Sequence, residues 1–332
     1  MRHAKNHVRF PFVLFVLVLL LLIPGRSASA EDPAAESFSD PNFTMEMEPG
    51  WDMRPIRYKN DNREAELSIV VNQQLSAVLL PMVDKYVSKK KVKIAMEIGT
   101  CGISAGAISR KEVDMGGFCC PPGKIDRLPG LQFHTLGITP LLLLVHKDNP
   151  VDNVTLDEAR KLFRGEVHNW SELGGQDLPV RPMGMLHCKK RPGHWRLILG
   201  SAKSFSPEFK VTGDIEDTIN MVATTPGSIG FEIRMNMLKL GRADDLKVLM
   251  IDGHDPMDLA RLRDNKYPFY RTMNVTTWKG RNITSPIADD LVRYLLKETR
   301  DVGKDQGIVP ASELRNAGWK FRGSELIGEP GQ

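Results

Sequence analysis

The sequence predicts an α/β protein built as two lobes that two crossings of the chain join together. From residue 66 onward, short apolar runs typical of buried strands alternate with segments of helical periodicity. This strand–helix–strand order is typical of parallel strands whose sheet is covered by helices on both faces. The chain leaves the first such unit near residues 147–152 and returns near 266–272, which indicates a hinge between two lobes.

The first lobe is predicted from a regular series of short elements. The apolar run at 67–71 indicates a buried strand, and apolar residues at helical spacing predict a helix over 75–86. The elements expected after them are strands at 93–98 and 113–118, a short helix at 104–111 between these strands, and a buried strand at 141–145.

The second lobe is expected to begin with a capped helix. Thr155 followed by Glu158 forms a capping box, and Gly165 closes the helix just beyond Phe163. The later elements of this lobe are predicted as strands at 180–185, 228–231 and 247–251 and helices near 195–199 and at 215–223. After the return to the first lobe, a strand is predicted at 273–277 and helices at 287–299 and from Ala311 onward.

The chain is expected to be exported. A basic start, an apolar run over 12–23 and Ala28-Ser-Ala30 predict a secretory signal peptide over 1–30, cleaved after Ala30. The mature protein would be periplasmic and not embedded in the membrane. The expected division is an irregular arm at 31–65, lobe I at 66–148 and 270–332, and lobe II at 149–269.

The charge of the mature chain excludes some partners. Four basic and no acidic residues lie in the segment 1–30, so its removal leaves 41 basic and 41 acidic residues. With no net charge and no block of like charges, the protein has no general basic field, and no nucleic acid partner is expected.

All four cysteines fall in three short loops that follow strand-like runs. In α/β proteins, ligands bind in loops at the ends of strands. Cysteine is ordinarily a buried packing residue, but four cysteines confined to three such loops indicate a site that uses sulfur. These residues are Cys101, Cys119, Cys120 and Cys188.

Several segments resemble the phosphate-type periplasmic binding proteins. The block at 155–180 is similar to the stretch that opens the second lobe in that family, and the resemblance extends over about residues 66–315. The matching pieces are TLDEARKLFRG at 155–165, VHNW at 167–170, LGG at 173–175, LPV at 178–180, TPGSIGF at 225–231, QGIVP at 306–310 and VDMG at 113–116.

The resemblance implies a venus-flytrap protein in which each lobe is a mixed sheet flanked by helices. Such a protein captures a small solute outside the membrane and presents it to an ABC permease or to the ectodomain of a sensor kinase. In this family, hydroxyls, helix N-terminal amides, an arginine and an acidic residue hold an oxyanion. The resemblance therefore implies a binding protein and not an enzyme.

The ligand loops are where this sequence departs from the family. Thr100, Ser104 and nearby amides could still hold an anion, but Cys101 lies beside them, and Cys119 replaces a polar family position. In the third loop, the family's hydroxyl pair is replaced around Pro192 and His194. The candidate ligand residues are Asn72, Gln73, Thr100, Cys101, Ser104, Cys119, Cys120, His187, Cys188 and His194.

These substitutions predict a thiophilic solute, with arsenite or Cu(I) as examples. Thiolates are soft ligands, and arsenite favours three of them, so Cys101, Cys119 and Cys188 are the expected ligands of a metal or metalloid. Helix N-termini and neighbouring basic residues are expected to lower the pKa of these three thiols. The sequence indicates no cofactor other than such a bound soft metal or metalloid.

Three other interpretations of the cysteines remain. They could form structural disulfides, since an oxidising compartment permits these and four cysteines allow three pairings, while an oxyanion occupies the cleft. They could be inert thiols. They could also serve thiol redox catalysis, although the chain contains no C-x-x-C motif and no third residue that would orient a thiol–imidazole pair.

Overall fold

The computed structural model describes Met1 and residues 38–59, 64–188 and 191–331. The chain forms two units, Met1–Glu31 and Asp32–Gln332, and the account below concerns the second. Apart from Met1, the predicted signal peptide lies outside the described residues, as does the start of the predicted arm. Among the described residues, no helix combines the length and the apolar character that crossing a membrane requires.

The first sheet has six strands in the order β13-β4-β12-β3-β1-β2. Strand β1 runs parallel to β2 and β3, whereas β12 runs antiparallel to β3 and β4, so the sheet is mixed. Its strands are β1 (Leu67–Asn72), β2 (Ile94–Gly99), β3 (Met115–Phe118), β4 (Leu131–Pro140), β12 (Tyr270–Trp278) and β13 (Val309–Pro310).

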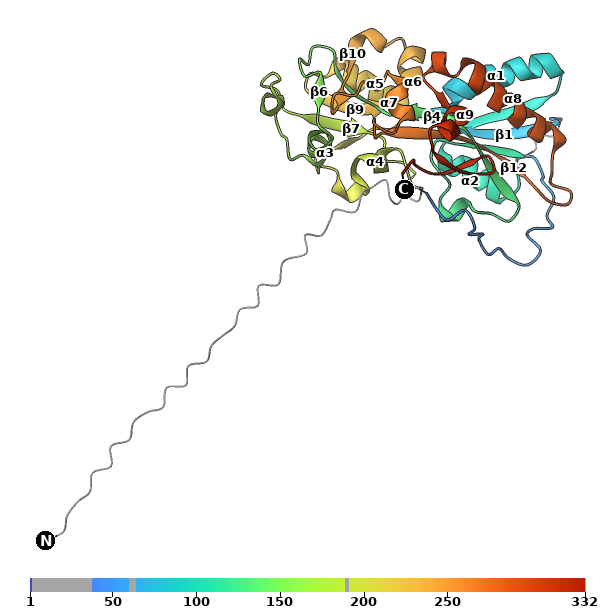
Figure 1. The fold of residues 1–332 in the computed structure, drawn as a ribbon. Coiled ribbons are helices and arrows are strands. Elements are labelled where there is room, and N and C mark those ends of the chain that lie inside the picture. The colour runs from blue at the N-terminus through green and yellow to red at the C-terminus, as the bar shows by residue number, and fades with distance from the viewer. Residues whose placement is uncertain (2–37, 60–63, 189–190, 332) are drawn as a thin grey trace. The chain divides into compact units, whose positions relative to one another are not determined.

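Both faces of this sheet are covered. Side chains alternate along a strand, so Ile69 and Val71 join one core cluster while Val70 joins another. The first cluster is formed with α1 (Gln73–Lys90) and α8 (Pro286–Val302), which lie side by side in Figure 1. The second is formed with α2 (Cys101–Ser109) and with Trp51 of the arm. The arm therefore packs on this sheet through a tryptophan that is 3% exposed.

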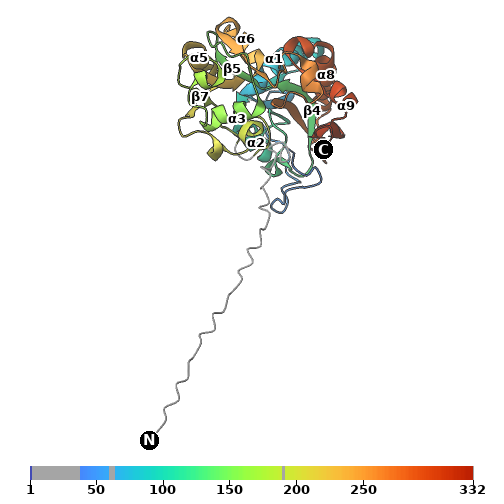
Figure 2. The ribbon, with the colours of Figure 1, turned by 60° about the vertical axis from the view of Figure 1, so that its left-hand side comes forward.

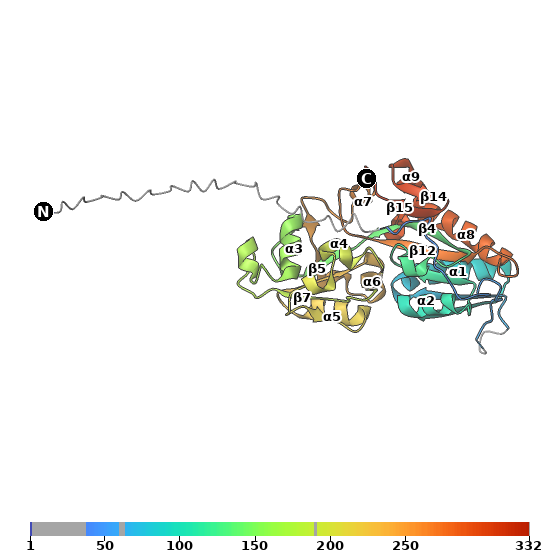
Figure 3. The ribbon, with the colours of Figure 1, turned by 90° about the horizontal axis from the view of Figure 1, so that it is seen from below.

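The second sheet has five strands in the order β10-β5-β9-β7-β8 and is also mixed. Figure 3 shows its elements on one side and those of the first sheet on the other, whereas the two groups partly overlap in the view of Figure 2. The elements here are β5 (Leu142–His146), α3 (Leu156–Arg164), β7 (Arg181–Gly184), α4 (Trp195–Leu199), β8 (Lys210–Val211), α5 (Ile215–Thr224), β9 (Ser228–Glu232), α6 (Arg234–Lys239) and β10 (Leu246–Val248).

Smaller elements complete the described part of the chain. Strands β6 (Asn153–Val154) and β11 (Met250–Ile251) pair in parallel, and β14 (Lys320–Arg322) pairs with β15 (Glu325–Gly328). The remaining elements are α7 (Leu259–Arg263), α9 (Ala311–Asn316) and the 3-10 turns η2 (Lys124–Asp126), η3 (Trp170–Leu173), η4 (Ala202–Ser204), η5 (Ala243–Asp245) and η6 (Lys304–Gln306).

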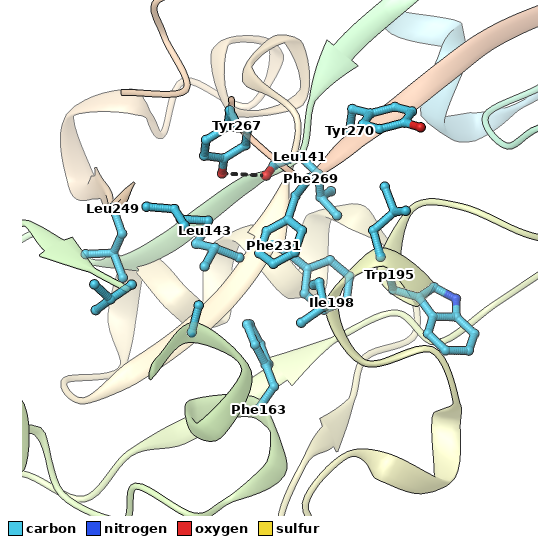
Figure 4. Close-up of a cluster of buried hydrophobic side chains, with 14 of the residues drawn as sticks. Leu141, Leu143, Phe163, Trp195, Ile198, Phe231, Leu249, Tyr267, Phe269 and Tyr270 are labelled. Carbon is cyan, nitrogen blue, oxygen red and sulfur yellow. Dashed lines mark hydrogen bonds between the residues drawn. The ribbon is translucent and has the colours of Figure 1, made fainter. Parts of the chain in front are cut away.

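The two crossings between the sheets are bonded to each other. Strand β4 ends at Pro140 in the first sheet, and β5 begins at Leu142 in the second. The amide of Leu141 donates to the Phe269 carbonyl at 2.9 Å, and the Tyr267 hydroxyl donates to the Leu141 carbonyl at 2.9 Å. Figure 4 shows this second bond above the apolar cluster of the second sheet. The lobe boundaries at 149–269 stay a prediction; the sheets themselves change at Leu141 and before Tyr270.

The capping box of α3 is present. Thr155 Oγ1 accepts from the Glu158 amide at 3.1 Å, and Glu158 Oε2 accepts from the Thr155 amide at 2.7 Å. Gly165 ends the helix with a φ of 72°. The two reciprocal bonds satisfy backbone donors that a helix start otherwise leaves unpaired.

Several elements are not among those predicted from the sequence, and strand β4 is the longest of them. It spans Leu131–Pro140 and leads directly into the first crossing between the sheets. Polar residues and Gly137 interrupt its apolar pattern. A Cβ atom at Gly137 would lie 2.4 Å from the Val309 carbonyl oxygen. Strand β13 can therefore pair with β4 at this position only because the residue there is glycine. The strand is therefore specified by its tertiary neighbours rather than by alternation along its own sequence.

Candidate functional site

Three loops bring the four cysteines together, and they come from both sheets. Cys101 begins α2 directly after β2, and Cys119 and Cys120 directly follow β3. Strand β1 is parallel to both β2 and β3, so these loops lie at the same edge of the first sheet. Cys188 lies between β7 of the second sheet and α4.

The thiols form a compact cluster. Cys101 Sγ lies 3.7 Å from Cys119 Sγ, which lies 3.9 Å from Cys120 Sγ. One ligand atom from each of Cys101, Cys119, Cys188 and His187 lies within 4.8 Å of the others. All four cysteines are free thiols, three buried and Cys188 half-buried, so the structure does not contain the structural disulfides of the alternative interpretation.

A single thiol of this cluster is favoured as a thiolate. Contact with the Cys101 thiol, and then with those of Cys120 and Cys188, lowers the pKa of Cys119. The Cys119 contact in turn raises the pKa of Cys101 and of Cys120. At Cys188, contact with Cys101 lowers the pKa, but contacts with Cys119 and Cys120 outweigh it, so the pKa is raised. The expectation that Cys101 and Cys188 also have lowered pKa values is wrong, because close neighbouring thiols cannot all ionise.

Two histidines, His187 and His194, lie beside the thiols. The Nε2 atoms of His187 and His194 lie 3.4 Å apart, while Nδ1 of His187 is buried without a hydrogen-bond partner. Burial lowers the pKa of His194, so this side chain is neutral. His194 adopts a φ of 52°, and Cys188 a φ of 58°. A loop with two non-glycine residues in this sparsely populated region is held by its surroundings, as is common at functional sites.

An ion pair attaches this loop to the first sheet. Arg191 Nη2 donates to Asp126 Oδ1 of η2 at 2.6 Å, and both side chains are buried. Gly193 adopts a φ of 87°, and a Cβ atom there would lie 2.8 Å from Cδ of Pro121. The loop of the second sheet therefore packs directly against the loop that carries Cys119 and Cys120.

The predicted oxygen donors are placed unevenly. Asn72 caps α1 and donates from Nδ2 to Cys101 Sγ at 3.0 Å, so it supports the cluster. Thr100 is exposed and caps α2 through its hydroxyl. Ser104 is completely buried, and its hydroxyl has no hydrogen-bond partner. Gln73 is the first residue of α1 and is half-buried.

A buried polar network beside the thiols was not predicted from the sequence. Arg271 Nη2 donates to Glu232 Oε1 at 3.2 Å, and Nη1 lies 3.9 Å from Cys119 Sγ. Gln74 Nε2 donates to the same Glu232 oxygen at 2.9 Å, and Asn236 Nδ2 donates to Glu232 Oε2 at 2.8 Å. Gln74 and Arg271 belong to the first sheet and its helices, Glu232 and Asn236 to the second, so the network joins the two halves.

Only a weak signal in the sequence pointed to these residues. Arg271 and Glu232 are single charged residues inside otherwise apolar or uncharged strand segments. A charge in such a run is almost never buried without a partner. That rule could have marked both as site candidates, but it does not indicate that they pair across 39 residues of sequence.

A separate cavity lies away from the cysteines. It has a volume of about 310 Å³ and is lined by the turn after β5 and the segment around Trp170, and it contains none of the predicted site residues. The convergence of the three cysteine loops is therefore the better candidate for the solute site.

Comparison with known proteins identifies relatives of the phosphate-binding type. No model of a known protein family matches the sequence. The chain is 24% identical over 263 residues to the phosphate-binding protein PstS of Bacillus subtilis (strain 168), a match that covers 77% of this chain and 84% of the relative.

Solved structures show the same fold. A protein from Clostridium perfringens, described as a phosphate ABC transporter substrate-binding protein with bound phosphate, superposes with a TM-score of 0.64 at 16% identity and covers 74% of this chain and 98% of that one. An ABC-type phosphate transport receptor from Vibrio cholerae gives a TM-score of 0.59 at 14% identity and covers 73% of this chain and 99% of that one. The predicted fold class is confirmed: the chain has the two-lobed periplasmic-binding-protein fold, with a mixed sheet flanked by helices in each half, and it resembles the phosphate-type binding proteins.

Proposed function

We propose that this protein is an extracytoplasmic solute-binding protein that captures a small solute between two lobes and delivers it to an ABC transporter. The observation that carries the proposal is the convergence of loops from both sheets on one buried group of thiols and polar side chains. The relatives described above are binding proteins or transport receptors, and this chain is likewise a binding protein and not an enzyme. Periplasmic export through residues 1–30 is part of the proposal.

The comparisons favour phosphate or another oxyanion as the solute. The B. subtilis relative is a phosphate-binding protein, and the C. perfringens structure holds phosphate. In this chain, Ser104 offers a buried hydroxyl without a partner close to the start of α2, where helix amides attract anions. The relatives described above are named for phosphate and not for a thiophilic solute, so the comparisons support the oxyanion more strongly.

The chemistry of the site favours a second candidate, a thiophilic solute such as arsenite or Cu(I). Oxyanion sites use oxygen and nitrogen donors, whereas the innermost groups here are sulfur atoms separated by 3.7 and 3.9 Å. Cys101, Cys119 and Cys188 are the proposed ligands. The alternative of a thiol redox protein gains no support from the relatives.

A fluorescence titration separates these solutes. Trp195 is buried and donates from Nε1 to the His187 carbonyl, so its emission should respond to a change in the loop that carries Cys188. The reduced protein is titrated with phosphate, arsenite and Cu(I), and a Trp195→Phe variant identifies which part of the signal comes from this residue.

Each solute has its own confirming variant. Saturation by phosphate that Ser104→Ala weakens and Cys119→Ser leaves intact would support the oxyanion. Saturation by arsenite or Cu(I) that Cys119→Ser abolishes would support the thiophilic solute. A protein that binds none of them and shows no closure in solution scattering with any of them would contradict the proposed role in solute capture.

A further inference from the structure

Three thiols and one imidazole from the three loops lie close together. We propose that Cys101, Cys119, Cys188 and His187 form a tetrahedral site for a thiophilic divalent metal ion of the zinc type. The inference deepens the function proposed above and rests on it, because the ion would be the solute that the protein captures. The proposed ion differs from arsenite and Cu(I), the thiophilic solutes named above, because it takes four ligands.

The spacing of the ligand atoms suits such an ion. All four atoms lie within 4.8 Å of one another, and two of the thiols are 3.7 Å apart. Zinc–thiolate bonds of about 2.3 Å in a tetrahedron place the sulfur atoms about 3.8 Å from one another. Small side-chain rotations would therefore bring the four atoms into bonding distance without moving the backbone of the three loops.

The fourth ligand atom, a nitrogen of His187, distinguishes a site for a metal ion from a site for a metalloid. Three cysteines and one histidine are an established ligand set for tetrahedral zinc, whereas arsenite favours three thiolates alone. Nδ1 of His187 is buried and has no hydrogen-bond partner, which is costly for a polar atom unless a ligand occupies it.

The surroundings of the four ligands suit an anionic metal centre. Three thiolates and a divalent ion leave one negative charge, which is costly to bury alone. Nη1 of Arg271 lies 3.9 Å from Cys119 Sγ and brings positive charge to the edge of the cluster. Asn72 donates to Cys101 Sγ at 3.0 Å, so two of the three thiolates have a polar group of the protein beside them.

Cys120 provides a matched control. Its thiol lies 3.9 Å from Cys119 and is as deeply buried, but the four-ligand group does not include it. It falls instead in a group with Cys119 and His194. Substitution of Cys120 thus makes the same chemical change as substitution of a ligand cysteine, within the same cluster.

The test measures the binding of Zn²⁺ and Co²⁺ to the purified, reduced protein. We expect one equivalent of Co²⁺ to bind and to give the thiolate-to-cobalt charge-transfer absorption and the visible bands of a tetrahedral site, which Zn²⁺ removes by competition. In Cys101→Ser, Cys188→Ser and His187→Gln, the affinity for Zn²⁺ should fall by more than about 100-fold, because changes outside the ligand set alone cost about 10- to 100-fold. Cys120→Ser changes a group beside a ligand and not a ligand itself, so its affinity for Zn²⁺ should fall by no more than about 10-fold.

A second measurement does not depend on whether the variants fold. Burial alone slows alkylation of these thiols in the metal-free, unsubstituted protein, so the comparison is between the rates with and without Zn²⁺. Zn²⁺ should slow the alkylation of Cys101, Cys119 and Cys188 much further and that of Cys120 much less. An equal slowing at all four cysteines, a Cys120→Ser affinity as low as that of the other cysteine variants, or a His187→Gln affinity equal to that of the unsubstituted protein would overturn the assignment.

The same samples separate this inference from the proposed function. If phosphate binds and closes the lobes in solution scattering while Zn²⁺ and Co²⁺ do not bind, the metal site is wrong and the function in solute capture stands. If Zn²⁺ binds to the four ligands but neither it nor phosphate changes the scattering profile, the metal site stands and the proposed function is wrong.

Discussion

One half-buried histidine, His134, is expected to make stability depend on pH. His134 Nε2 lies 2.8 Å from Thr277 Oγ1, Nδ1 contacts the Ser324 hydroxyl, and burial lowers the pKa of His134 from 6.5 to about 4. Because the unfolded chain binds the proton more tightly, this group contributes stability above about pH 6.5 that is lost as the pH falls toward 4.

The expected loss can be measured against a neutral variant. Between pH 7.5 and 4.5 the unsubstituted protein should lose about 2 to 3 kcal/mol more free energy of unfolding than His134→Gln, as urea unfolding would show. His168→Gln removes an exposed histidine and serves as the control. Equal pH dependence of the His134→Gln and unsubstituted proteins would mean that His134 does not titrate as its burial requires.

Individual residues also show where sequence reasoning was sufficient. The positions of all four cysteines after strand-like runs indicated a shared site, and the structure places their thiols in contact. The ion pair of Arg271 with Glu232 could not be predicted in the same way, because it depends on how β12 and β9 approach each other in space. Their local sequence contains no motif that records this approach.

At the scale of elements, the capping box of α3 makes a direct prediction. Thr155→Ala removes the hydroxyl that accepts from the Glu158 amide, so the free energy of unfolding should fall by about 1 kcal/mol. Thr155→Ser keeps a hydroxyl and should lose much less. Chemical denaturation of the three proteins provides the measurement, and equal losses in the two variants would show that the capping bond does not stabilise α3.

Elements with strong local signals were the ones that the sequence predicted well. Helix α3 has caps at both ends, and β1 and β5 are mostly apolar runs, so their predicted bounds agree with the structure to within a residue or two. Strand β4 has polar residues and a glycine where its neighbours β12 and β13 require them. Its pattern reflects two partners that lie far away in the sequence, and local periodicity therefore could not identify it.

At the scale of the whole molecule, the two halves are joined by both covalent and noncovalent links. The chain crosses between the sheets at Leu141 and before Tyr270, and the two crossings are hydrogen-bonded to each other. Next to the thiol cluster, Glu232 receives bonds from Gln74 and Arg271 across the interface between the halves. Paired crossings permit a hinge motion, and the Glu232 contacts are among those that would have to break for the lobes to open.

Glu232 should accordingly control both closure and stability. Glu232→Gln leaves the buried guanidinium of Arg271 without its carboxylate, and breaking a buried pair by removing one partner costs about 3 to 5 kcal/mol. The structure can avoid part of this cost by opening, which lets water reach Arg271, so we expect a larger radius of gyration in solution scattering together with a lower free energy of unfolding. Asp301→Asn breaks exposed pairs with Lys297 and Arg300 and should change neither the stability nor the radius measurably. If Glu232→Gln matched Asp301→Asn in both measurements, the Glu232 network would not hold the lobes together, and closure would have to depend on the solute alone.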